Sequence, residues 1–343
     1  MRKKTQASLK QIAEATNLSI TTVSRVLRGQ GEISEKTRKK VLKIAQELNY
    51  RPNLLIQGIQ TGRTGNIGVM VPPFDSYWTE VLKGIHDQLI QAEYAPITLW
   101  DDSEAVGTDK EAFMLKQMHR LIDRRVDGVI LWPKVSEVFG AHLDELESRK
   151  LPVVTIDHEL SFSDSVTTDE KLGAALVAEH LYTLGHRRIG HLAGEPHWTW
   201  AKLRRQYFEE SLANFPGTQC LTVIGSDNPE DIPAAAKALL SLTPRPTAIF
   251  ACSDWVAFEI YNMAIEMGIR IPEDLSVVGC SDTHKLPQLI TPPLTTIRQH
   301  AREIGLTAAT LVIERLSPET AAKPQKHINI TCELTVRGST RRV

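Results

Sequence analysis

The chain has 343 residues, 42% of them hydrophobic and 24% charged, and a chain of this length is expected to form two or three domains. No apolar run approaches the roughly 18 residues of a membrane span, and the N-terminus lacks the apolar segment of a secretory signal. An integral membrane protein and an exported one are therefore not expected, and the cytoplasm is the expected compartment. The net charge of −1 conceals an asymmetry, because residues 1–63 hold 13 Lys and Arg against 4 Asp and Glu, whereas the remainder holds 27 against 37. A basic N-terminal part predicts binding to a polyanion.

Three short helices are predicted in residues 1–52. Ser8, Ser19 and Ser34 each stand where a serine side chain can cap the start of a helix. The apolar residues that follow recur at helical spacing and are expected to face a common core: Leu9, Ile12, Ala13, Val23, Val26, Leu27, Val41, Leu42, Ala45 and Leu48. Three helices with a short turn between the first two predict a helix-turn-helix domain.

The second helix begins with "ITTV", and these β-branched residues are poor helix formers. The front of a recognition helix is selected for its contacts in the DNA major groove and not for helix propensity. The side chains that offer hydroxyl groups, apolar contact or a guanidinium to DNA are Ile20, Thr21, Thr22, Ser24 and Arg25. Val23 is expected to point into the core. The alternative is that the threonines are ordinary exposed polar residues.

Residues 53–64, "NLLIQGIQTGRT", are short enough for a linker but unusually apolar. From residue 65 onward, apolar segments alternate with helical ones, as in a parallel α/β sheet. These segments are "NIGVMVP", "APITLWD", "VDGVILWP", "LPVVTID", "RRIGHLAG", "CLTVIG", "TAIFACSD" and "LSVVGCSD". We expect two lobes divided by a break near residues 160–165, with "LTTIRQ" and "HINITCELTVRGST" passing back through both. The expected boundaries are 1–52 for the head, 53–64 for the hinge, about 65–164 and 298–323 for lobe 1, and about 165–297 and 324–340 for lobe 2.

All six tryptophans follow the predicted strands: Trp78, Trp100, Trp132, Trp198, Trp200 and Trp255. The carboxyl ends of parallel strands meet at one edge of a sheet, where ligands bind. Flat aromatic rings stack on the apolar faces of sugar rings, so this placement favours a carbohydrate ligand. The alternative is that tryptophan is simply common near surfaces and lobe interfaces.

Acidic residues also follow the strands, and they are Asp101, Asp157, Asp227, Asp254 and Asp282. Together with Arg204, which comes shortly after Trp200, they could bind sugar hydroxyl groups through charge-assisted hydrogen bonds. Aspartates after strands are also frequent helix N-caps, a reading that stays open for Asp254 and Asp169.

Enzyme signatures are missing from the sequence: it has no Gly-rich phosphate loop, no nucleophile elbow and no histidine pair with metal spacing. The four cysteines show no paired short spacing, which favours reduced thiols over a disulfide or a zinc site. We therefore expect no enzyme, no cofactor and no structural metal.

Three segments, "SLKQIAEATNLSITTVSRVL", "ISEKTRKKVLKIAQELNYRPN" and "TGRTGNIGVMVP", carry a resemblance to a known family. They resemble the lactose-repressor/galactose-repressor (LacI-type) family of transcriptional regulators, and the resemblance continues through the whole chain. It implies a helix-turn-helix head, a hinge helix that enters the DNA minor groove with Ile59 as its wedge, and a core similar to periplasmic sugar-binding proteins. The implied DNA contacts are Ser8, Leu9, Ser19, Ile20, Thr21, Thr22, Ser24, Arg25, Ser34, Thr37, Tyr50, Asn53, Ile56 and Ile59.

The same resemblance implies effector contacts from Asp157, Arg204, the region of Asp227, and the Tyr77–Trp78 pair. With the residues that follow strands, the candidate effector site comprises Tyr77, Trp78, Asp101, Trp132, Asp157, Trp198, Trp200, Arg204, Asp227, Ser253, Asp254, Trp255 and Asp282. The chain departs from the family pattern where Ser253 replaces asparagine and Ser281 replaces aspartate. The sequence thus predicts a regulator, expected to be a repressor, that binds a near-palindromic DNA operator as a homodimer and responds to a small molecule, expected to be a sugar. The alternative is a sugar-binding protein without a role on DNA.

Overall fold

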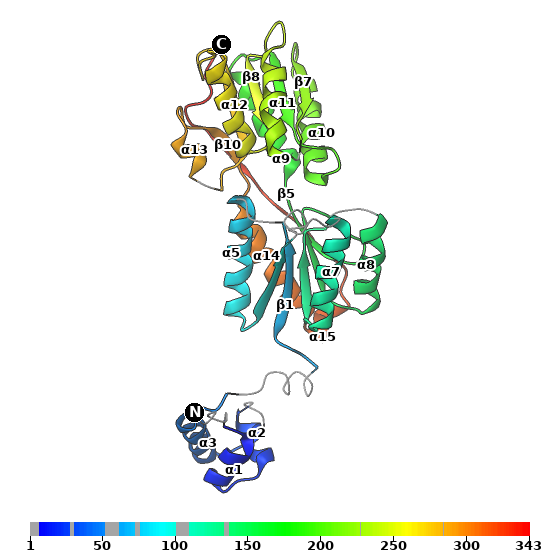
Figure 1. The fold of residues 1–343 in the computed structure, drawn as a ribbon, viewed down its shortest axis with the longest axis vertical. Helices are drawn as coiled ribbons and strands as arrows, with labels where there is room; N and C mark the ends of the chain where they lie inside the picture. Colours follow the sequence, from blue (N-terminus) through cyan, green and yellow to red (C-terminus); the bar gives the residue numbers. More distant parts are fainter. Residues whose placement is uncertain are drawn as a thin grey trace. The chain divides into compact units, whose positions relative to one another are not determined.

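The computed structural model describes residues 7–27, 31–51, 62–72, 76–100, 110–133, 137–226, 228–283 and 285–343. Contacts divide the chain into two units, Met1–Thr64 and Gly65–Val343, which we call the head and the core (Figure 1). No helix in the described part of the chain is both long and apolar enough to cross a membrane.

The head consists of three helices, α1 (Leu9–Thr16), α2 (Ile20–Leu27) and α3 (Glu35–Glu47). Their buried side chains form one small cluster: Ile12, Ala13, Val23, Val26, Val41 and Ala45. Leu42 and Leu48 were also predicted to face this core, but they are 47% and 40% exposed. This part of the prediction is wrong because the short α1 and α2 cover only a narrow stripe of α3.

Serine caps fix where the head helices begin. The Ser8 Oγ accepts a hydrogen bond from the Gln11 amide (3.3 Å), and the Gln11 side chain accepts one in return from the Ser8 amide (2.8 Å). The Oγ atoms of Ser19 and Ser34 accept hydrogen bonds from amides three residues on, at 3.1 and 3.3 Å. Each cap satisfies a backbone donor that the helix itself leaves free. The three predicted caps are therefore confirmed.

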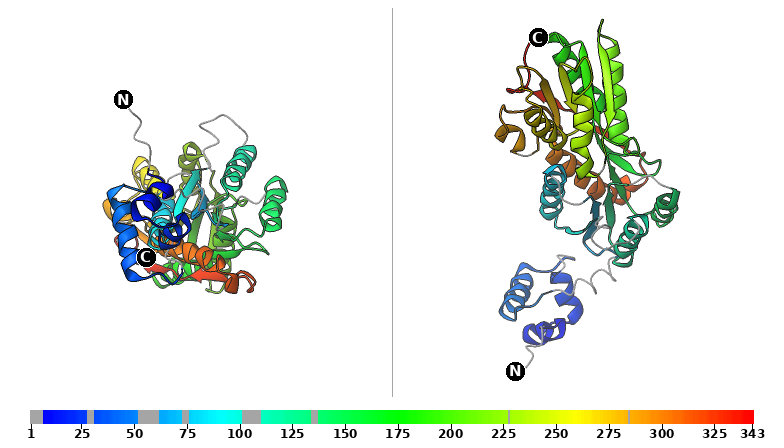
Figure 2. Two further views of the ribbon diagram at one scale, coloured as in Figure 1. Left: turned by 90° about the horizontal axis from the view of Figure 1, so that it is seen from below. Right: turned by 45° about the horizontal axis from the view of Figure 1, so that its top comes forward.

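Lobe 1 of the core is built on a six-stranded parallel sheet in the order β11-β5-β4-β3-β1-β2. Its strands are β1 (Asn66–Val71), β2 (Ala95–Trp100), β3 (Gly128–Leu131), β4 (Val153–Ile156), β5 (Asp164–Thr168) and β11 (His327–Ile330). Helices α5 (Ser76–Gln91) and α14 (Ala301–Arg315) cover one face, and α7 (Lys110–Asp123) and α8 (Glu137–Ser148) cover the other (Figures 1 and 2).

Side-chain alternation along β1 explains why both faces of this sheet are covered. Ile67, Val69 and Val71 pack into the cluster formed with α5 and α14, whereas Met70 packs on the opposite face with α7 and α8. On the first of these faces, α5 and α14 approach each other through Gly84 and Gly305. A Cβ atom at Gly84 would lie 2.1 Å from the nearest carbonyl oxygen of α14, so no larger residue fits there.

Lobe 2 repeats this plan with the strand order β12-β10-β9-β8-β6-β7, parallel except for β12. Its strands are β6 (Arg188–Ala193), β7 (Gln219–Ile224), β8 (Ala248–Ala251), β9 (Ser276–Ser281), β10 (Thr295–Arg298) and β12 (Glu333–Thr335). Its longer helices are α9 (Glu170–Thr183), α10 (Thr199–Ala213), α11 (Ile232–Leu240) and α12 (Asp254–Glu266), and its short ones are η1 (Pro229–Asp231) and α13 (Leu286–Leu289). The helices again cover both faces of the sheet.

The predicted fold class is confirmed, and all eight predicted strand segments contain strands. The lobe boundaries, however, need a correction. We expected residues from 165 onward to belong to lobe 2, but β5 pairs with β4 in the sheet of lobe 1. Likewise, β11 lies in lobe 1 although residues 324–340 were expected in lobe 2. The chain therefore crosses between the lobes three times, after β5, after β10 and after β11 (Figure 1).

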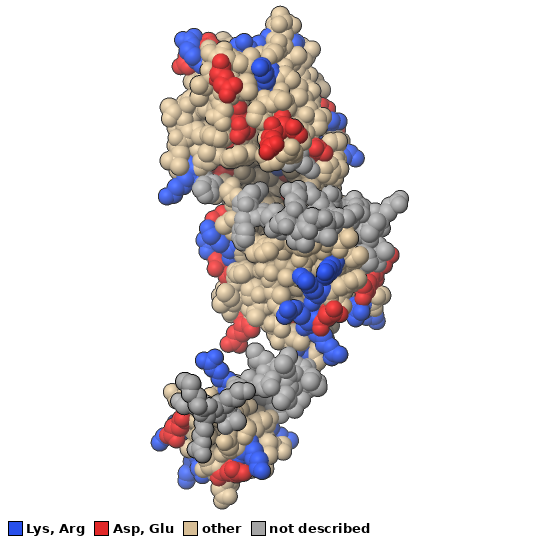
Figure 3. Space-filling model, in the orientation of Figure 1, with Lys and Arg blue, Asp and Glu red and all other residues tan. Residues whose placement is uncertain are grey.

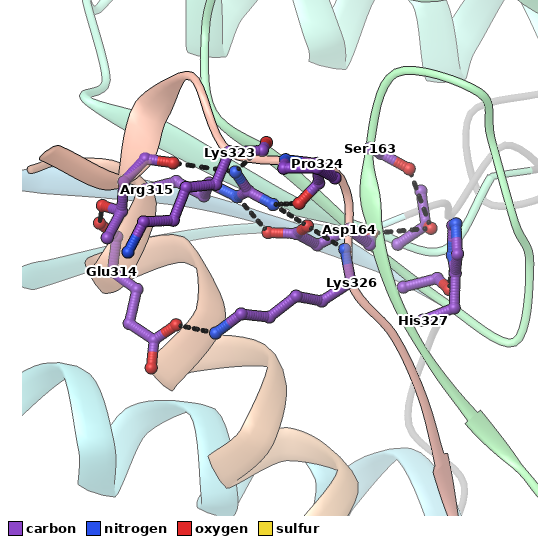
Figure 4. Close-up of polar contacts among 11 residues, drawn as sticks. Ser163, Asp164, Glu314, Arg315, Lys323, Pro324, Lys326 and His327 are labelled. Carbon is purple, nitrogen blue, oxygen red and sulfur yellow. Dashed lines mark hydrogen bonds and ion pairs between the residues drawn. The ribbon is translucent and has the colours of Figure 1, made fainter. Parts of the chain in front are cut away.

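A buried ion pair holds β5 to the end of α14 (Figure 4). The Arg315 guanidinium donates two hydrogen bonds of 2.6 Å to the Asp164 carboxylate, and these side chains are only 11% and 1% exposed. Arg315 also donates to the backbone carbonyl groups of Thr320, Lys323 and Pro324. These bonds fix the return of the chain through α15 (Pro318–Ala321) into β11.

Candidate functional site

The second helix of the head, α2, presents two different faces. Val23 and Val26 are buried in the head core, as predicted. On the other face, Thr21 and Arg25 are exposed and Ile20 is 49% exposed. About half of the Ile20 side chain therefore remains as apolar surface that can contact another molecule.

The remaining predicted DNA contacts of the head are also accessible. The exposed ones are Ser8, Ser19 and Ser34, and the half-buried ones are Leu9, Thr22, Ser24, Thr37 and Tyr50. The exposed cations of the described head are Lys10, Arg25, Lys36, Lys39, Lys40, Lys43, Arg51 and Arg63, and Figure 3 shows basic side chains on its surface. Asn53, Ile56 and Ile59 lie outside the described residues.

In the core, the candidate effector residues gather where the strand order of each sheet reverses. This reversal lies between β1 and β3 in lobe 1, and between β6 and β8 in lobe 2. At such a point the loops leave in opposite directions and open a crevice at the carboxyl ends of the strands. A cavity of about 860 Å³ occupies this place between the lobes. Ten of the predicted residues line it: Tyr77, Trp78, Trp132, Asp157, Trp198, Trp200, Arg204, Ser253, Asp254 and Trp255.

Aromatic rings form much of the cavity wall. Trp132 of lobe 1 stacks on Trp198 of lobe 2, with ring centroids 4.5 Å apart and planes 29° apart. Trp78 meets Trp132 edge-on at 5.5 Å. Trp100, by contrast, packs at the edge of the lobe 1 core and does not line the cavity. Five of the six tryptophans line the cavity, and the expectation that all six face the cleft is wrong for Trp100.

Arg204 is held at the inner wall by a residue that sequence reasoning missed. The Nε and Nη2 atoms of Arg204 donate to the two carboxylate oxygens of Glu170 at 2.7 and 2.6 Å, and Nη1 donates to the Cys252 carbonyl. The guanidinium also lies 4.9 Å from the centroid of the Trp200 ring. Gln299 contacts the same carboxylate at 3.3 Å. The signal that could have revealed Glu170 is the end of β5 at Thr168, two residues before it.

Asp157 is a half-buried carboxylate that lines the cavity. It follows β4 with a left-handed backbone (φ 57°), a conformation that Asp and Asn tolerate better than most residues. Burial and then the neighbouring charge of Glu170 raise the pKa of Asp157 to about 7, while Arg204 acts in the opposite direction. Near neutral pH this group is thus able both to donate and to accept a hydrogen bond. The nearby Tyr77 hydroxyl is buried without a hydrogen-bond partner of good geometry.

Two predicted effector contacts have structural partners instead. The Asp282 carboxylate is 1% exposed, pairs with Arg298 and Arg337 at 2.7 Å each, and does not line the cavity. This corrects the prediction that Asp282 contacts an effector. Asp254 does line the cavity, but its oxygens accept hydrogen bonds from Thr296 (2.5 Å), from Ser281 (3.0 Å) and from a backbone amide.

Helix capping accounts for two further residues. Ser253, not Asp254, is the N-cap of α12, and it accepts a hydrogen bond from the Val256 amide at 3.2 Å. Asp169 caps α9, as one of the two readings of the sequence predicted. Asp101 and Asp227 lie outside the described residues.

Comparison with known proteins agrees with both parts of this geometry. Residues 8–53 match the model of the bacterial regulatory proteins of the lacI family, and residues 178–340 match a periplasmic binding protein-like domain. The HTH-type transcriptional repressor PurR of Mannheimia succiniciproducens is 30% identical over 98% of this chain and 99% of that protein. The chain belongs to the lacI family. The resemblance inferred from the sequence is confirmed, and the protein is a DNA-binding transcriptional regulator.

Solved structures of two lacI-family members extend the comparison. The Lac repressor dimer bound to operator and the anti-inducer ONPF has a TM-score of 0.83 with 25% identity, covering 98% of this chain and 99% of that chain. A regulator from Enterococcus faecium with bound ribose has a TM-score of 0.69 with 27% identity, covering 81% of this chain and 99% of that one. The PurR proteins of Haemophilus influenzae and Mannheimia succiniciproducens are HTH-type transcriptional repressors.

Proposed function

We propose that this lacI-family protein is a cytoplasmic repressor that binds a near-palindromic operator as a homodimer, catalyses no reaction, and is controlled by a carbohydrate in the interlobe cavity. The observation that carries the proposal is the cavity, because five tryptophans line it at the places where the strand order of the two sheets reverses. The ribose in the E. faecium neighbour supports a sugar as ligand. The operator-bound dimer of the Lac repressor supports the assembly, since one helix-turn-helix reads only a half-site.

On DNA, the exposed face of α2 has the side chains that base readout requires. Ile20 can contact a thymine methyl group, and the Thr21 hydroxyl and the Arg25 guanidinium can bind base edges or phosphates. The Ser8, Ser19 and Ser34 caps stand at helix N-termini, where backbone amides favour phosphate. We assign Asn53, Ile56 and Ile59 to the hinge contacts with the minor groove.

In the cavity, the tryptophan rings would stack on the sugar while Asp157 and Ser253 bind its hydroxyl groups. A ligand that contacts both lobes favours one lobe arrangement over another, and so shifts the equilibrium between DNA-binding states. A sugar-binding protein without a DNA role is disfavoured, because residues 8–53 match the DNA-binding family model.

The DNA half of the proposal is tested by selecting binding sites from random duplexes. A double change at Ile20 and Thr21 should alter the selected consensus, because both side chains are exposed at the front of α2. The matched control is Lys39→Ala, which removes an exposed cation from α3 and should weaken binding to all sequences alike. An unchanged consensus in the double variant would contradict base readout by α2.

The ligand half is tested by thermal denaturation against a panel of sugars. A sugar that binds the folded core should stabilise it by about 2.7 kcal/mol at a hundredfold excess over its Kd. A Trp132→Ala variant should lose this shift while keeping its affinity for DNA. Equal shifts in the parent and the variant would place the sugar elsewhere.

A further inference from the structure

The only basic side chains that line the described part of the cavity, Arg204 and Lys83, are each paired with a carboxylate. Lys83 contacts Glu80 at 2.5 Å. Arg204 forms the two-bond pair with Glu170, in which the side chains are 5% and 11% exposed. The cavity wall therefore presents no cation that lacks an anionic partner among the described residues.

Carboxylates outnumber cations on this wall. The acidic residues that line the cavity in the described part of the chain are Glu80, Asp157, Glu170 and Asp254. Since Glu80 and Glu170 are each paired with a cation, an anionic ligand would lie beside Asp157, which is partly ionised near neutral pH, in a partly desolvated space where repulsion between like charges is stronger than in water. The aromatic side chains of the wall carry no formal charge, so they do not offset the carboxylates.

Glu170 cannot easily give up Arg204 to a ligand. It is the first residue of α9, where the helix dipole favours a negative charge, and Gln299 also holds it at 3.3 Å. An anion that took Arg204 would leave the Glu170 carboxylate nearly buried and without its ion pair. Breaking a buried pair in this way is strongly unfavourable, because the abandoned charge stays out of water.

We infer that Glu170 sets the charge class of the effector: by neutralising Arg204 it makes the cavity accept sugars that carry no anionic group and reject phosphorylated or acidic sugars. This inference rests on the proposed function for the identity of the ligand as a sugar. Glu170 acts through Arg204 as a specificity-determining residue. Uncharged hydroxyl groups, or a protonated amine, can use Asp157 and the aromatic walls without breaking any ion pair.

Inorganic phosphate is a probe that needs no knowledge of the effector. We compare the parent, Glu170→Gln, and a Glu170→Gln/Arg204→Gln double variant by thermal denaturation of the full chain, in phosphate and in chloride at equal ionic strength. Tryptophan fluorescence follows the core alone, since every tryptophan lies beyond residue 65, and phosphate binding to the basic head is common to all three proteins. We expect phosphate to raise the midpoint of Glu170→Gln by about 2–4 °C more than that of the other two. Equal shifts in the Glu170→Gln and double variants would overturn the inference.

Pairs of sugars test the same point on the parent alone, so the test does not depend on the variants folding. The pairs are ribose with ribose 5-phosphate, glucose with glucose 6-phosphate, and glucose with glucosamine. Stabilisation of the parent by a phosphorylated sugar, lost in Arg204→Gln, would overturn the inference. If no sugar stabilises the parent while phosphate stabilises only Glu170→Gln, the assignment of a carbohydrate effector fails but the exclusion of anions stands.

Discussion

Replacing Asp157 by Asn should stabilise the core relative to the parent, and this gain in stability should be larger at pH 8 than at pH 5. Asp157 has a pKa of about 7 in the fold because burial and the charge of Glu170 disfavour its ionised form. Its unfolded value is near 3.8, so folding loses stability as the pH rises through this interval. Asn keeps the shape of the side chain, carries no charge, and tolerates the left-handed backbone at this position (φ 57°).

The size of the effect follows from the shift in pKa. A shift of about three units corresponds to about 4 kcal/mol above pH 7, and water in the cavity reduces this to about 2–4 kcal/mol. At pH 5, where the folded protein keeps Asp157 protonated, we expect less than half of this advantage. The difference between Asp157→Asn and the parent should therefore grow by about 1–3 kcal/mol from pH 5 to pH 8.

Urea unfolding at both pH values, followed by tryptophan fluorescence, measures this difference on the core. His186 and His191 are buried with their pKa values lowered to about 4 by desolvation, but they titrate alike in both proteins and cancel. The matched control is Asp282→Asn, which has a similar backbone (φ 49°) but removes two ion pairs. It should lose stability at both pH values. An advantage of Asp157→Asn that is equal at pH 5 and pH 8 would refute the reasoning.

Three further predictions concern other parts of the chain. Asp164→Asn should lower the free energy of unfolding of the core by about 3–5 kcal/mol, because it leaves Arg315 nearly buried without its ion pair; an unchanged urea midpoint would contradict this. Val23→Ala should destabilise the head by about 1–3 kcal/mol through a cavity at a fully buried position, which circular dichroism would detect while the tryptophan signal of the core stays unchanged. Burial lowers the pKa of His191 from 6.5 to about 4. The neutral ring therefore contributes stability above pH 6.5 that is lost as the pH falls. Between pH 7 and pH 5 the free energy of unfolding of the parent should decrease by about 2 kcal/mol through His191. His191→Phe should lose that much less in urea titrations at the two pH values, and an identical loss would exclude His191 as a contributor.

Local sequence was sufficient to predict most of the elements. The head helices begin at Ser8, Ser19 and Ser34 because a serine cap acts within three residues, a distance that sequence spacing reveals directly. The eight predicted strands are apolar runs, and six of them, all except the edge strands β2 and β7, are almost entirely buried in their sheets, a pattern that needs no knowledge of their neighbours. The convergence of Trp78, Trp132 and Trp198 on one cavity followed from the strand ends, since parallel strands place their carboxyl ends together, whereas Tyr77 was implied by the family resemblance.

Some elements depend on contacts that local sequence does not encode. The sequence pattern does not reveal β5, because "DSVTT" holds one strongly apolar residue, Val166, and the polar Asp164, Ser165 and Thr168 are buried only because the strand lies between β4 and β11. Leu42 and Leu48 have the spacing of core residues, but whether they are covered depends on the length of α1 and α2. The lobe boundaries follow from these pairings and not from any break in composition.

The charges of the site show the same division. The sequence by itself determined that Asp157 follows a strand and that Arg204 lies in the first turns of the helix after the next predicted strand, because strand ends and helix starts can be read locally. Only the tertiary structure decided that Arg204 pairs with Glu170, 34 residues away, and that Asp282 is committed to Arg298 and Arg337. The physical reason is that a buried charge is costly unless an opposite charge lies within about 3 Å of it. In these pairs the partner comes from a different strand or helix, so only the fold brings it into place. Residue type and position therefore predict where a charge stands, while the partners brought by the fold decide whether it is free to bind a ligand.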